Sequence, residues 1–417
     1  MGEFVIEEAK RCLQCKKPMC REGCPVNTPV NEVMKLFLEG NIIEAGEKLF
    51  KNNPLSVVCS LVCPHENQCE GHCVMGRKSN PIQISSVENY ISNYYLNFIT
   101  SGAVKKINKK VAIIGSGPAG ITIAFILADK GYDITIFEAH DKIGGVLRYG
   151  IPDFRLPNSV LEKLEEKLVS MGIKIRPNTL IGSVITIDDL FRDEYKAVFI
   201  GTGVWKSRAL GIKGETLGHV HYAIDYLKKP DAYKLGNRVC IIGGGNVAMD
   251  AARIALRNGS REVYIMYRRG PGDIQAGRTE VEYARIDGVK FEYYKVPVEI
   301  IGEGIKYART EIVKDENGKA KVVKIEGSED IFKADSIIIA AGQVPRANIV
   351  SSTKGIEVNA QGLVVTDELG RTTREGVFAS GDVVTGAKTV VAAVRVSKLV
   401  AQAIEGYITQ SCEVKSK

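Results

Sequence analysis

Hydrophobic residues follow two different periods along the chain, and the period changes near residue 110. In the first part, apolar side chains recur at three- and four-residue intervals, which predicts helices. One such run follows Thr28-Pro29, a pair that suits the N-cap and first turn of a helix, and its apolar positions are Val30, Val33, Met34, Phe37 and Leu38. A second helix is expected from Ser85 to about residue 99. The basic stretch 105–110 is the expected linker between the helical part and the rest of the chain.

From Val111 onward, short β runs alternate with helical segments, which is the pattern of parallel α/β domains. Two apolar strands lead directly into glycine-rich turns at Gly115 and Gly243. The segments 197–203 and 336–342 also resemble each other, because each is an apolar strand that ends in small residues. This internal repetition predicts two similar dinucleotide-binding folds, one inserted in the other.

The first glycine turn, Gly115-Ser116-Gly117-Pro118-Ala119-Gly120, lies between the strand 110–114 and a helix. Its first glycine permits the tight turn, the second lets backbone N–H groups reach a pyrophosphate, and the third lets helix and strand pack closely. The next strand, 133–137, ends at Glu138, where an acid can accept hydrogen bonds from ribose hydroxyls. The alternative is that this glycine-rich segment is a chance turn that binds no dinucleotide. The predicted dinucleotide contacts are Gly115, Gly117, Pro118, Ala119, Gly120 and Glu138.

The second turn follows the strand 239–242 and has an alanine in place of the third glycine, which the fingerprint allows. Its next strand, 262–267, ends in Arg268-Arg269 and not in an acid. Guanidinium groups bind a 2′-phosphate that a carboxylate would repel, so NADP(H) is favoured over NAD(H). Solvated arginines at a strand end are the alternative. The predicted contacts are Gly243, Gly245, Asn246, Val247, Ala248, Arg268 and Arg269.

Eight of the ten cysteines fall between Cys12 and Cys73, in two closely spaced groups. The first group is Cys12, Cys15, Cys20 and Cys24; the second is Cys59, Cys63, Cys69 and Cys73. Thiolates at such spacing suit iron–sulfur cubanes, and the fourth cysteine of one run often binds the other cluster. Zinc is the rival, and His65 and His72 are near enough in sequence to join such a site.

Composition and charge exclude several classes of protein. The 417 residues carry a net charge of only +7, and no helix combines a basic stripe with aromatic residues, so nucleic acid is not an expected partner. No apolar run approaches the ~18 residues of a membrane span, and the start lacks the pattern of a signal peptide. We therefore expect a cytoplasmic protein, in which clustered cysteines bind metal and do not form disulfides.

One more element appears near the end, where the strand 376–380 runs into Gly381-Asp382. An aspartate at such a turn either caps the next helix or binds a ribitol. Together with the first glycine turn and Glu138, this segment resembles the paired FAD motifs of the two-dinucleotide-binding flavoproteins. No Cys-x-x-Cys pair accompanies them, so a disulfide reductase is not expected.

Nearly the whole chain resembles one family, the glutamate synthase small subunit and the NADPH-oxidising half of dihydropyrimidine dehydrogenase. The resemblance rests on both cysteine groups, 144–157 and 243–250, and the segments 268–276 and 388–391 favour the dihydropyrimidine dehydrogenase branch. It implies FAD contacts at Gly145, Leu147, Arg148, Gly381, Asp382, Thr389 and Val390. It also implies one 4Fe–4S cluster on Cys12, Cys15, Cys20 and Cys73, and a second on Cys24, Cys63, Cys69 and Glu88. Two alternatives stay open: Cys59 is the fourth ligand of the second cluster, or Glu88 only closes a capping box with Ser85.

The expected fold class is α/β, with two Rossmann-like domains, one inserted in the other, behind an α-helical domain that binds two 4Fe–4S clusters. The expected divisions are 1–105 for the iron–sulfur domain, 106–225 and 346–417 for the FAD domain, and 226–345 for the NAD(P)H domain. The expected reaction passes hydride from NADPH, with NADH as the alternative donor, to FAD and single electrons through both clusters.

The expected acceptor is a partner in a hetero-oligomer, because the chain shows no FMN barrel of its own. A dihydropyrimidine dehydrogenase-type FMN reductase is the first hypothesis and the glutamate synthase large subunit the second. A stand-alone or bifurcating NAD(P)H:ferredoxin oxidoreductase is the third. A zinc-binding docking module is the non-redox alternative for the N-terminal domain.

Overall fold

The structure is a computed structural model that describes residues 2–98, 105–182, 184–314, 318 and 320–415, with side chains up to residue 410. The chain divides into two compact units. The first consists of 1–148, 153–204 and 344–417, and the second of 149–152 and 205–343. The second unit is thus inserted in the first, while the finer division at 105, 225 and 345 stays a prediction.

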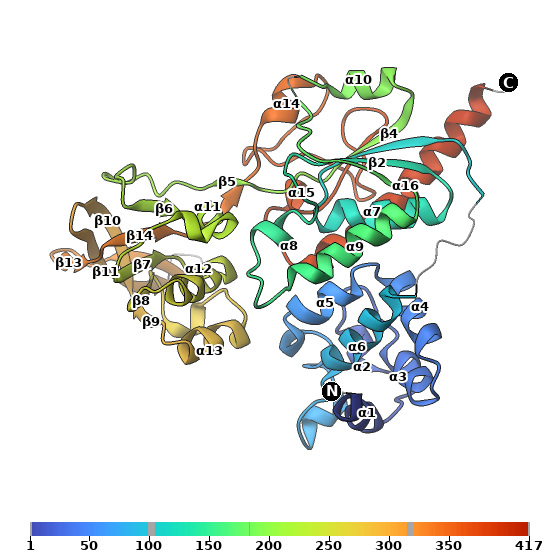
Figure 1. Ribbon diagram of the computed structural model, residues 1–417. Helices are drawn as coiled ribbons and strands as arrows, with labels where there is room; N and C mark the ends of the chain where they lie inside the picture. Colours follow the sequence, from blue (N-terminus) through green and yellow to red (C-terminus); the bar gives the residue numbers. More distant parts are fainter. Residues whose placement is uncertain (1, 99–104, 183, 315–317, 319, 416–417) are drawn as a thin grey trace. The chain divides into compact units, whose positions relative to one another are not determined.

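The N-terminal part of the first unit is helical, drawn in blue in Figure 1. Its helices are α1 (Gly2–Lys10), α2 (Met19–Glu22), α3 (Val30–Leu38), α4 (Ile42–Asn52), α5 (Ser56–Val62) and α6 (Ile84–Leu96), with short 3-10 turns η1 (His65–Asn67) and η2 (Val74–Arg77). The predicted helical period of α3 is confirmed, because Val33, Met34 and Phe37 are buried in the core between α1, α4 and α6. The predicted second helix is α6.

The N-cap predicted at Thr28 is wrong. Helix α3 begins at Val30, directly after Pro29, and no side chain caps it. Thr28 therefore lies one position too early to cap the helix. Its buried hydroxyl has other partners, the sulfur of Cys24 at 3.3 Å and the amide nitrogen of Asn52 at 3.4 Å.

The rest of the first unit is built on a parallel sheet with the strand order β16-β4-β1-β2-β3. The strands are β1 (Lys110–Ile114), β2 (Asp133–Phe137), β3 (Lys174–Arg176), β4 (Tyr195–Ile200) and β16 (Val377–Ala379). The long helices beside it are α7 (Pro118–Asp129), α9 (Asn158–Ser170) and α16 (Val390–Lys415), and α7 and α16 run side by side beneath the sheet in Figure 1. Four short helices complete the unit, namely α8 (Val146–Tyr149), α10 (Ile187–Arg192), α14 (Asn348–Ser352) and α15 (Asp382–Thr385). The last residue of α8, Tyr149, is assigned to the second unit.

Helix α7 is apolar around its whole circumference, which is typical of a helix with no solvent-facing side. Ile121, Ile123 and Leu127 are fully buried. Phe125 is also buried, and its ring meets Phe50 of α4 edge to face with centroids 5.2 Å apart. Full burial of such a side chain contributes about 1.5–3 kcal/mol. Helix α7 therefore packs on its own sheet, on α16 and on the cluster-bearing helices.

The second unit repeats the parallel plan. Its sheet has the order β6-β14-β7-β8-β9, so that β7, β8, β9 and β14 take the places of β1, β2, β3 and β4. The strands are β6 (Val220–Tyr222), β7 (Arg238–Ile242), β8 (Glu262–Tyr267), β9 (Lys290–Tyr293) and β14 (Ser336–Ile339). Helices α11 (Ala223–Lys228), α12 (Asn246–Arg257) and α13 (Arg278–Ile286) accompany it, with the 3-10 turns η3 (Pro230–Ala232) and η4 (Pro271–Asp273). The predicted pair of similar folds, one inserted in the other, is confirmed.

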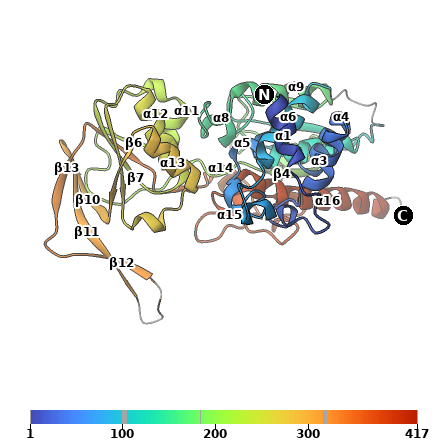
Figure 2. The same cartoon turned by 90° about the horizontal axis from the view of Figure 1, so that it is seen from below.

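An antiparallel sheet extends this unit, as Figure 2 shows. Its strands are β10 (Lys295–Ile301), β11 (Gly304–Lys314), β12 (Ala320–Lys324) and β13 (Asp330–Lys333), and a two-stranded sheet pairs β5 (Lys206–Ser207) with β15 (Gln343–Val344). Within the residues that the structure describes, no helix combines the length and apolar character needed to cross a bilayer.

Candidate cluster and nucleotide sites

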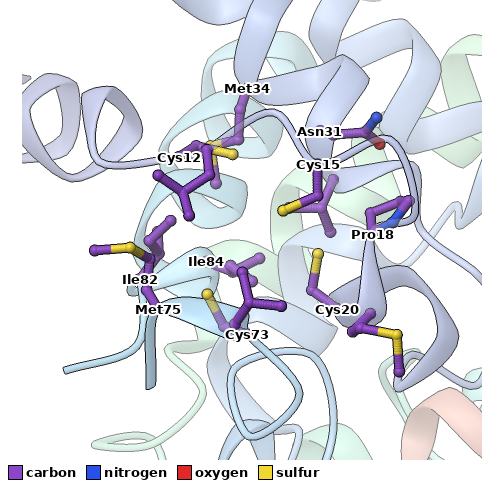
Figure 3. A pocket seen from close by; sticks show the side chains of 14 residues that line it. Cys12, Cys15, Pro18, Cys20, Asn31, Met34, Cys73, Met75, Ile82 and Ile84 are labelled. Atoms are coloured by element: carbon purple, nitrogen blue, oxygen red, sulfur yellow. The ribbon is translucent and has the colours of Figure 1, made fainter. Parts of the chain in front are cut away.

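Four cysteines converge on one pocket in the helical part of the first unit (Figure 3). Cys12 and Cys15 come from the loop after α1, Cys20 from α2 and Cys73 from the residue before η2. The loop turns between the first two at Gln14, which has a φ of 48°, a left-handed conformation that is uncommon outside glycine. The predicted first ligand set is thus brought together, and the fourth member comes from the second cysteine group.

The rest of this pocket is apolar, with Met34, Ile82 and Ile84 among its lining residues (Figure 3). Burial raises the pKa of the Cys20 thiol to about 11, and the nearby Cys73 adds to the shift. Burial likewise raises the pKa of Cys12, against a hydrogen bond from the backbone of Gln14. Burial and the neighbouring thiols thus oppose ionisation of Cys12 and Cys20, so the pocket needs cations before all its cysteines can bind as thiolates. The iron atoms of a cluster supply that charge, so the donor set fits a 4Fe–4S cluster.

A second group of soft and acidic donors lies near the first. Cys63 follows α5, Cys69 lies between η1 and η2, and Cys24 lies shortly after α2. The pKa of Cys69 is raised by burial and then by the neighbouring negative groups Glu88, Glu70 and Cys24. The pKa of Cys63 is also raised, first by a hydrogen bond with Cys59 and by burial. The nearby negative groups of Glu88 and Cys69 add to this shift. The structure therefore brings together all the residues that were predicted to bind a second cluster.

Glu88 lies on α6, inside the helix, and burial raises the pKa of its carboxyl to about 8. The capping box with Ser85 is wrong: Ser85 is the second residue of α6, and its backbone N–H and hydroxyl both donate to Glu70 Oε1, at 2.9 and 2.6 Å. Cys59 is buried one helical turn before Cys63 and shares a hydrogen bond with that thiol. Glu88 is thus left facing Cys63 and Cys69 without a capping role.

The zinc alternative has little support in the donor geometry. Across the described residues, no three His, Cys, Asp or Glu side chains are grouped closely enough to hold a single metal ion. His65 Nε2 is bound to the carbonyl of Cys59 at 3.1 Å, and His72 Nδ1 to the carbonyl of Gln68 at 2.6 Å. Thiolates about 2.3 Å from a single zinc would lie close together, whereas a cubane spreads its ligands over four irons.

The first glycine turn has the shape that a dinucleotide needs. Gly115 has a φ of +96°, and a Cβ there would lie 2.7 Å from the carbonyl oxygen of Gly201. A Cβ on Gly120 would lie 2.0 Å from the oxygen of Gly115, so helix α7 and strand β1 can approach only through this glycine. At Gly117, by contrast, the nearest atom to a Cβ is 3.9 Å away, which leaves the helix N-terminus accessible to a phosphate. Pro118 and Ala119 form the first turn of α7.

Glu138 directly follows β2 and is almost fully buried. Its Oε2 accepts from the backbone N–H and hydroxyl of Ser116, and its Oε1 accepts from the backbone N–H of His140 at 2.8 Å and contacts Nδ1 at 3.0 Å. Burial opposes ionisation, but these hydrogen bonds lower the pKa of Glu138. The carboxylate thus fixes the glycine turn, and a ribose hydroxyl would replace one of these donors. Sequence reasoning missed His140, although it lies only two residues away.

The other predicted FAD contacts surround the same turn. A Cβ on Gly145 would lie 2.9 Å from Gly117 Cα, so the two loops touch. Arg148 binds the carbonyl of Ile143 and Oδ1 of Asn158, but its buried Nη2 has no hydrogen-bond partner among the described residues. A buried guanidinium N–H without an acceptor is costly, and a bound cofactor oxygen would satisfy it. Leu147 beside it is fully buried.

The C-terminal segment contributes two helix N-termini. Gly381 precedes α15, and Asp382 Oδ1 accepts from the N–H of Lys388 at 3.1 Å. Burial raises the pKa of Asp382 to about 6. Thr389 Oγ1 accepts from the N–H of Ala392 at 3.3 Å and thereby caps α16, which starts at Val390. These residues fit the FAD contacts that the resemblance implied.

The second glycine turn, in the inserted unit, repeats the first. Gly243 has a φ of +152°, and a Cβ on it would lie 2.5 Å from the oxygen of Ala340. Nothing lies within 4 Å of a Cβ on Gly245, which precedes α12, so this helix N-terminus is open to a phosphate. Asn246 Oδ1 accepts from the N–H of Gly277 at 2.9 Å, and its neighbours on α12 are Val247 and the buried Ala248.

Arg268 and Arg269 follow β8 at the edge of this turn. In the described part of the chain their guanidinium groups form no ion pair or side-chain hydrogen bond, and Arg268 is exposed. The loop 270–277 then folds back, and the N–H groups of Gln275 and Ala276 both donate to the oxygen of Gly244, at 3.0 and 2.9 Å. Sequence reasoning missed this loop as a wall of the site. Two unpaired cations beside an open helix N-terminus fit a nucleotide with an additional phosphate.

Two family models match the chain in turn. The model described as pyridine nucleotide-disulphide oxidoreductase matches residues 109–397. The model described as dihydropyrimidine dehydrogenase domain II, 4Fe-4S cluster, matches residues 2–98. The two together cover both units and the cysteine pocket.

Individual relatives are similar over most of the chain. It is 37% identical to the glutamate synthase (NADPH) small chain of Halomonas elongata, over 96% of this chain and 90% of that one. It is 32% identical to the NADP(+)-dependent formate dehydrogenase subunit beta of Moorella thermoacetica, over 94% of this chain and 60% of that one. Among solved structures, FprA of Mycobacterium tuberculosis in complex with NADPH has a TM-score of 0.65 at 19% identity, covering 74% of this chain and 86% of its own, a similarity of fold.

Proposed function

The chain belongs to the pyridine nucleotide-disulphide oxidoreductase family and is a relative of glutamate synthase small chains, and from this we propose that it is the electron-input subunit of a larger redox enzyme. It is an NAD(P)H-dependent FAD oxidoreductase with a 4Fe–4S domain. The proposal adds that NADPH is the donor, that two clusters are present and that a partner subunit accepts the electrons. The observation that carries it is the convergence of Cys12, Cys15, Cys20 and Cys73 on one pocket.

The residues of the chain bind and orient the reacting groups. When bound, FAD would supply a hydride acceptor for NADPH and a donor of single electrons. The N-termini of α7 and α16 face the flavin nucleotide in this proposal, with Glu138 and Arg148 holding its polar groups. Arg268 and Arg269 hold the 2′-phosphate of NADPH. No acid–base pair is needed, because hydride carries its proton and both electrons together.

The order of the clusters follows from their surroundings in the first unit. The donors around Cys63 lie on the side of the helical part that packs against α16, because α5 touches α16. The pocket of Cys12 and Cys73 adjoins the exposed Leu13, of which 61% is accessible. We therefore propose that Cys63, with Glu88 as the fourth ligand, would hold the cluster nearer α16, and that Cys73 would hold the cluster nearer the surface on which a partner would accept electrons.

Two hypotheses for the acceptor are distinguished by different observations. The segment 268–276 and the match to dihydropyrimidine dehydrogenase domain II favour an FMN-containing pyrimidine reductase. The 37% identity to the Halomonas elongata chain favours a glutamate synthase large subunit. Mixing the purified chain with each large subunit, and measuring NADPH-dependent uracil reduction or glutamate formation, separates them.

Iron, acid-labile sulfide and FAD should be measured on anaerobically purified protein, followed by titration with NADPH and with NADH. We expect about eight iron atoms and eight sulfides per flavin, and bleaching of the flavin at lower concentrations of NADPH than of NADH. Zinc without sulfide would refute the electron-conducting function and leave a flavoprotein with a structural N-terminal domain.

The face around the Cys73 pocket is basic, and this predicts an acidic partner. Lys16, Lys17, Arg77 and Lys78 are exposed and form no ion pair within the described residues. Charge reversal in Lys16→Glu/Lys17→Glu is expected to slow NADPH-dependent reduction of an acidic two-cluster ferredoxin about tenfold at low salt. The difference should vanish at high salt, because exposed charges are then screened.

The matched control for this experiment is Lys174→Glu/Lys196→Glu, which makes the same change of charge at exposed positions of strands β3 and β4 in the same unit. It should leave the rate unchanged. Equal slowing in both variants would mean that net charge matters and docking at the Cys73 face does not.

A further inference from the structure

A chain of hydrogen bonds leads from helix α16 to the sulfur of Cys24. Lys398 Nζ lies 2.6 Å from the backbone oxygen of Asn52 and 3.1 Å from its Oδ1. Asn52 Nδ2 lies 3.4 Å from Thr28 Oγ1, and Thr28 Oγ1 lies 3.3 Å from Cys24 Sγ. All four residues belong to the first unit, and Lys398 is 346 residues from Asn52 in the sequence. The proposed function makes no use of these hydrogen bonds.

The direction of every donor in this chain is fixed by chemistry. A lysine ammonium can only donate, so the oxygen of the Asn52 amide must face Lys398 and its NH₂ group must face Thr28. The Thr28 hydroxyl accepts from that NH₂ group and has a single hydrogen left. A thiolate bound to iron can only accept, so this hydrogen points to Cys24 Sγ. All the hydrogen bonds therefore run from the cation toward the sulfur.

We propose that Lys398, Asn52 and Thr28 form a relay that places positive polarisation on the Cys24 sulfur and raises the reduction potential of the cluster that it binds. This inference rests on the proposed function, since it needs the second cluster to be present. Hydrogen bonds to the sulfurs are among the features that set cluster potentials. Adding an electron to the cluster increases its negative charge, which the relay stabilises.

The surroundings of Lys398 support this role. Its side chain is partly buried, and burial lowers its pKa while the negative Cys24 opposes that shift, so the two charges interact. Lys398 also belongs to α16, the helix whose N-terminus is proposed to face the flavin. Thr28 is only 5% exposed, which keeps water from competing for its hydroxyl.

A purely structural role is the competing explanation, because Asn52 is the last residue of α4 and a lysine suits a helix C-terminus. That role predicts a loss of thermal stability in Lys398→Met and no change in potential. The relay predicts that Lys398→Met and Thr28→Val both lower the potential of one and the same cluster. We expect about a tenfold lower equilibrium constant for its one-electron reduction, which corresponds to about 59 mV.

The test is an EPR-monitored redox titration of the anaerobic holoprotein. Cys63→Ala first identifies which signal belongs to the cluster in question. Thr28→Ser should retain the wild-type potential, because it keeps the hydroxyl, and Lys398→Arg should retain most of it. The matched control is Lys51→Met, which removes an exposed positive charge from the residue next to Asn52 without touching the relay.

The outcomes separate this inference from the proposed function. Equal shifts in Lys398→Met and Lys51→Met, or an unchanged potential in Thr28→Val, would overturn the relay while both clusters remain countable. An iron content of a single cluster, with no signal lost in Cys63→Ala, would instead overturn the two-cluster function and the relay with it.

Discussion

Replacing Cys73 with alanine is expected to halve the iron and sulfide content, from about eight to about four of each per flavin. Cys73 comes from the second cysteine group but points into the pocket of Cys12, Cys15 and Cys20 (Figure 3). Three remaining thiols cannot cap all four irons of a cubane. The EPR signal of one cluster should disappear in the dithionite-reduced protein, while NADPH should still bleach the flavin, because the nucleotide sites lie on other elements. Electron delivery to a ferredoxin should fall at least 100-fold.

Cys59→Ser serves as the control for this experiment. Cys59 is 4% exposed and lies beside the second donor group, but it does not line the Cys73 pocket. If Glu88 is the fourth ligand of the second cluster, this variant keeps both clusters. Loss of a cluster in Cys59→Ser would assign that ligand to Cys59, and full iron in Cys73→Ala would refute the first ligand set.

Removing both guanidinium groups in Arg268→Ala/Arg269→Ala is expected to raise KM for NADPH about 100-fold. A hydrogen bond to a charged group contributes about 1.5–3 kcal/mol, and each 1.4 kcal/mol corresponds to a factor of about ten. The value of kcat with NADPH should change little, because the phosphate is bound equally in the ground state and the transition state. KM for NADH should stay within about twofold of the wild type, since NADH has no 2′-phosphate.

Arg278→Ala is the matched control, because this arginine starts α13 after the loop 270–277 and is exposed. It pairs with Glu282 at 3.3 Å and should not discriminate between the two nucleotides. Steady-state kinetics with both donors on all variants provide the measurement. An equal loss with NADPH and NADH in the double variant would show that the arginines only stabilise the loop.

The nucleotide-binding halves were predictable from sequence because their signals are local. Strands β2 and β8 have the predicted bounds, and both glycine turns precede helices, since a turn, its strand and its helix lie within thirty residues of one another. The two parallel sheets have corresponding strand orders because the same strand–helix unit is repeated in both. Local signals also explain one failure: Thr28 before Pro29 matches the statistics of a helix cap, yet a buried sulfur and amide engage its hydroxyl.

The cluster sites depend on contacts that local patterns do not encode. The cysteine spacing suggested clusters, but only a family resemblance placed Cys73 with Cys12. Lys398 could not be linked to Asn52 from the sequence, because the two residues meet only after α16 has packed on the helical part. The role of Glu70 was equally unpredictable from the sequence. It accepts the hydrogen bonds of Ser85, and this removes the capping interpretation of Glu88.

The burial of α7 on all sides bears on how such proteins diversify. Its Phe125 meets Phe50 of the cluster-bearing helices, while other faces of the same helix meet the sheet and α16. If recombination exchanged only the N-terminal helices or only the flavin-binding sheet, part of this apolar surface would meet water or an ill-fitting neighbour. The two should therefore be inherited together as one cassette, and new partners should be acquired by substitutions on the outer surface or by fusion at the ends.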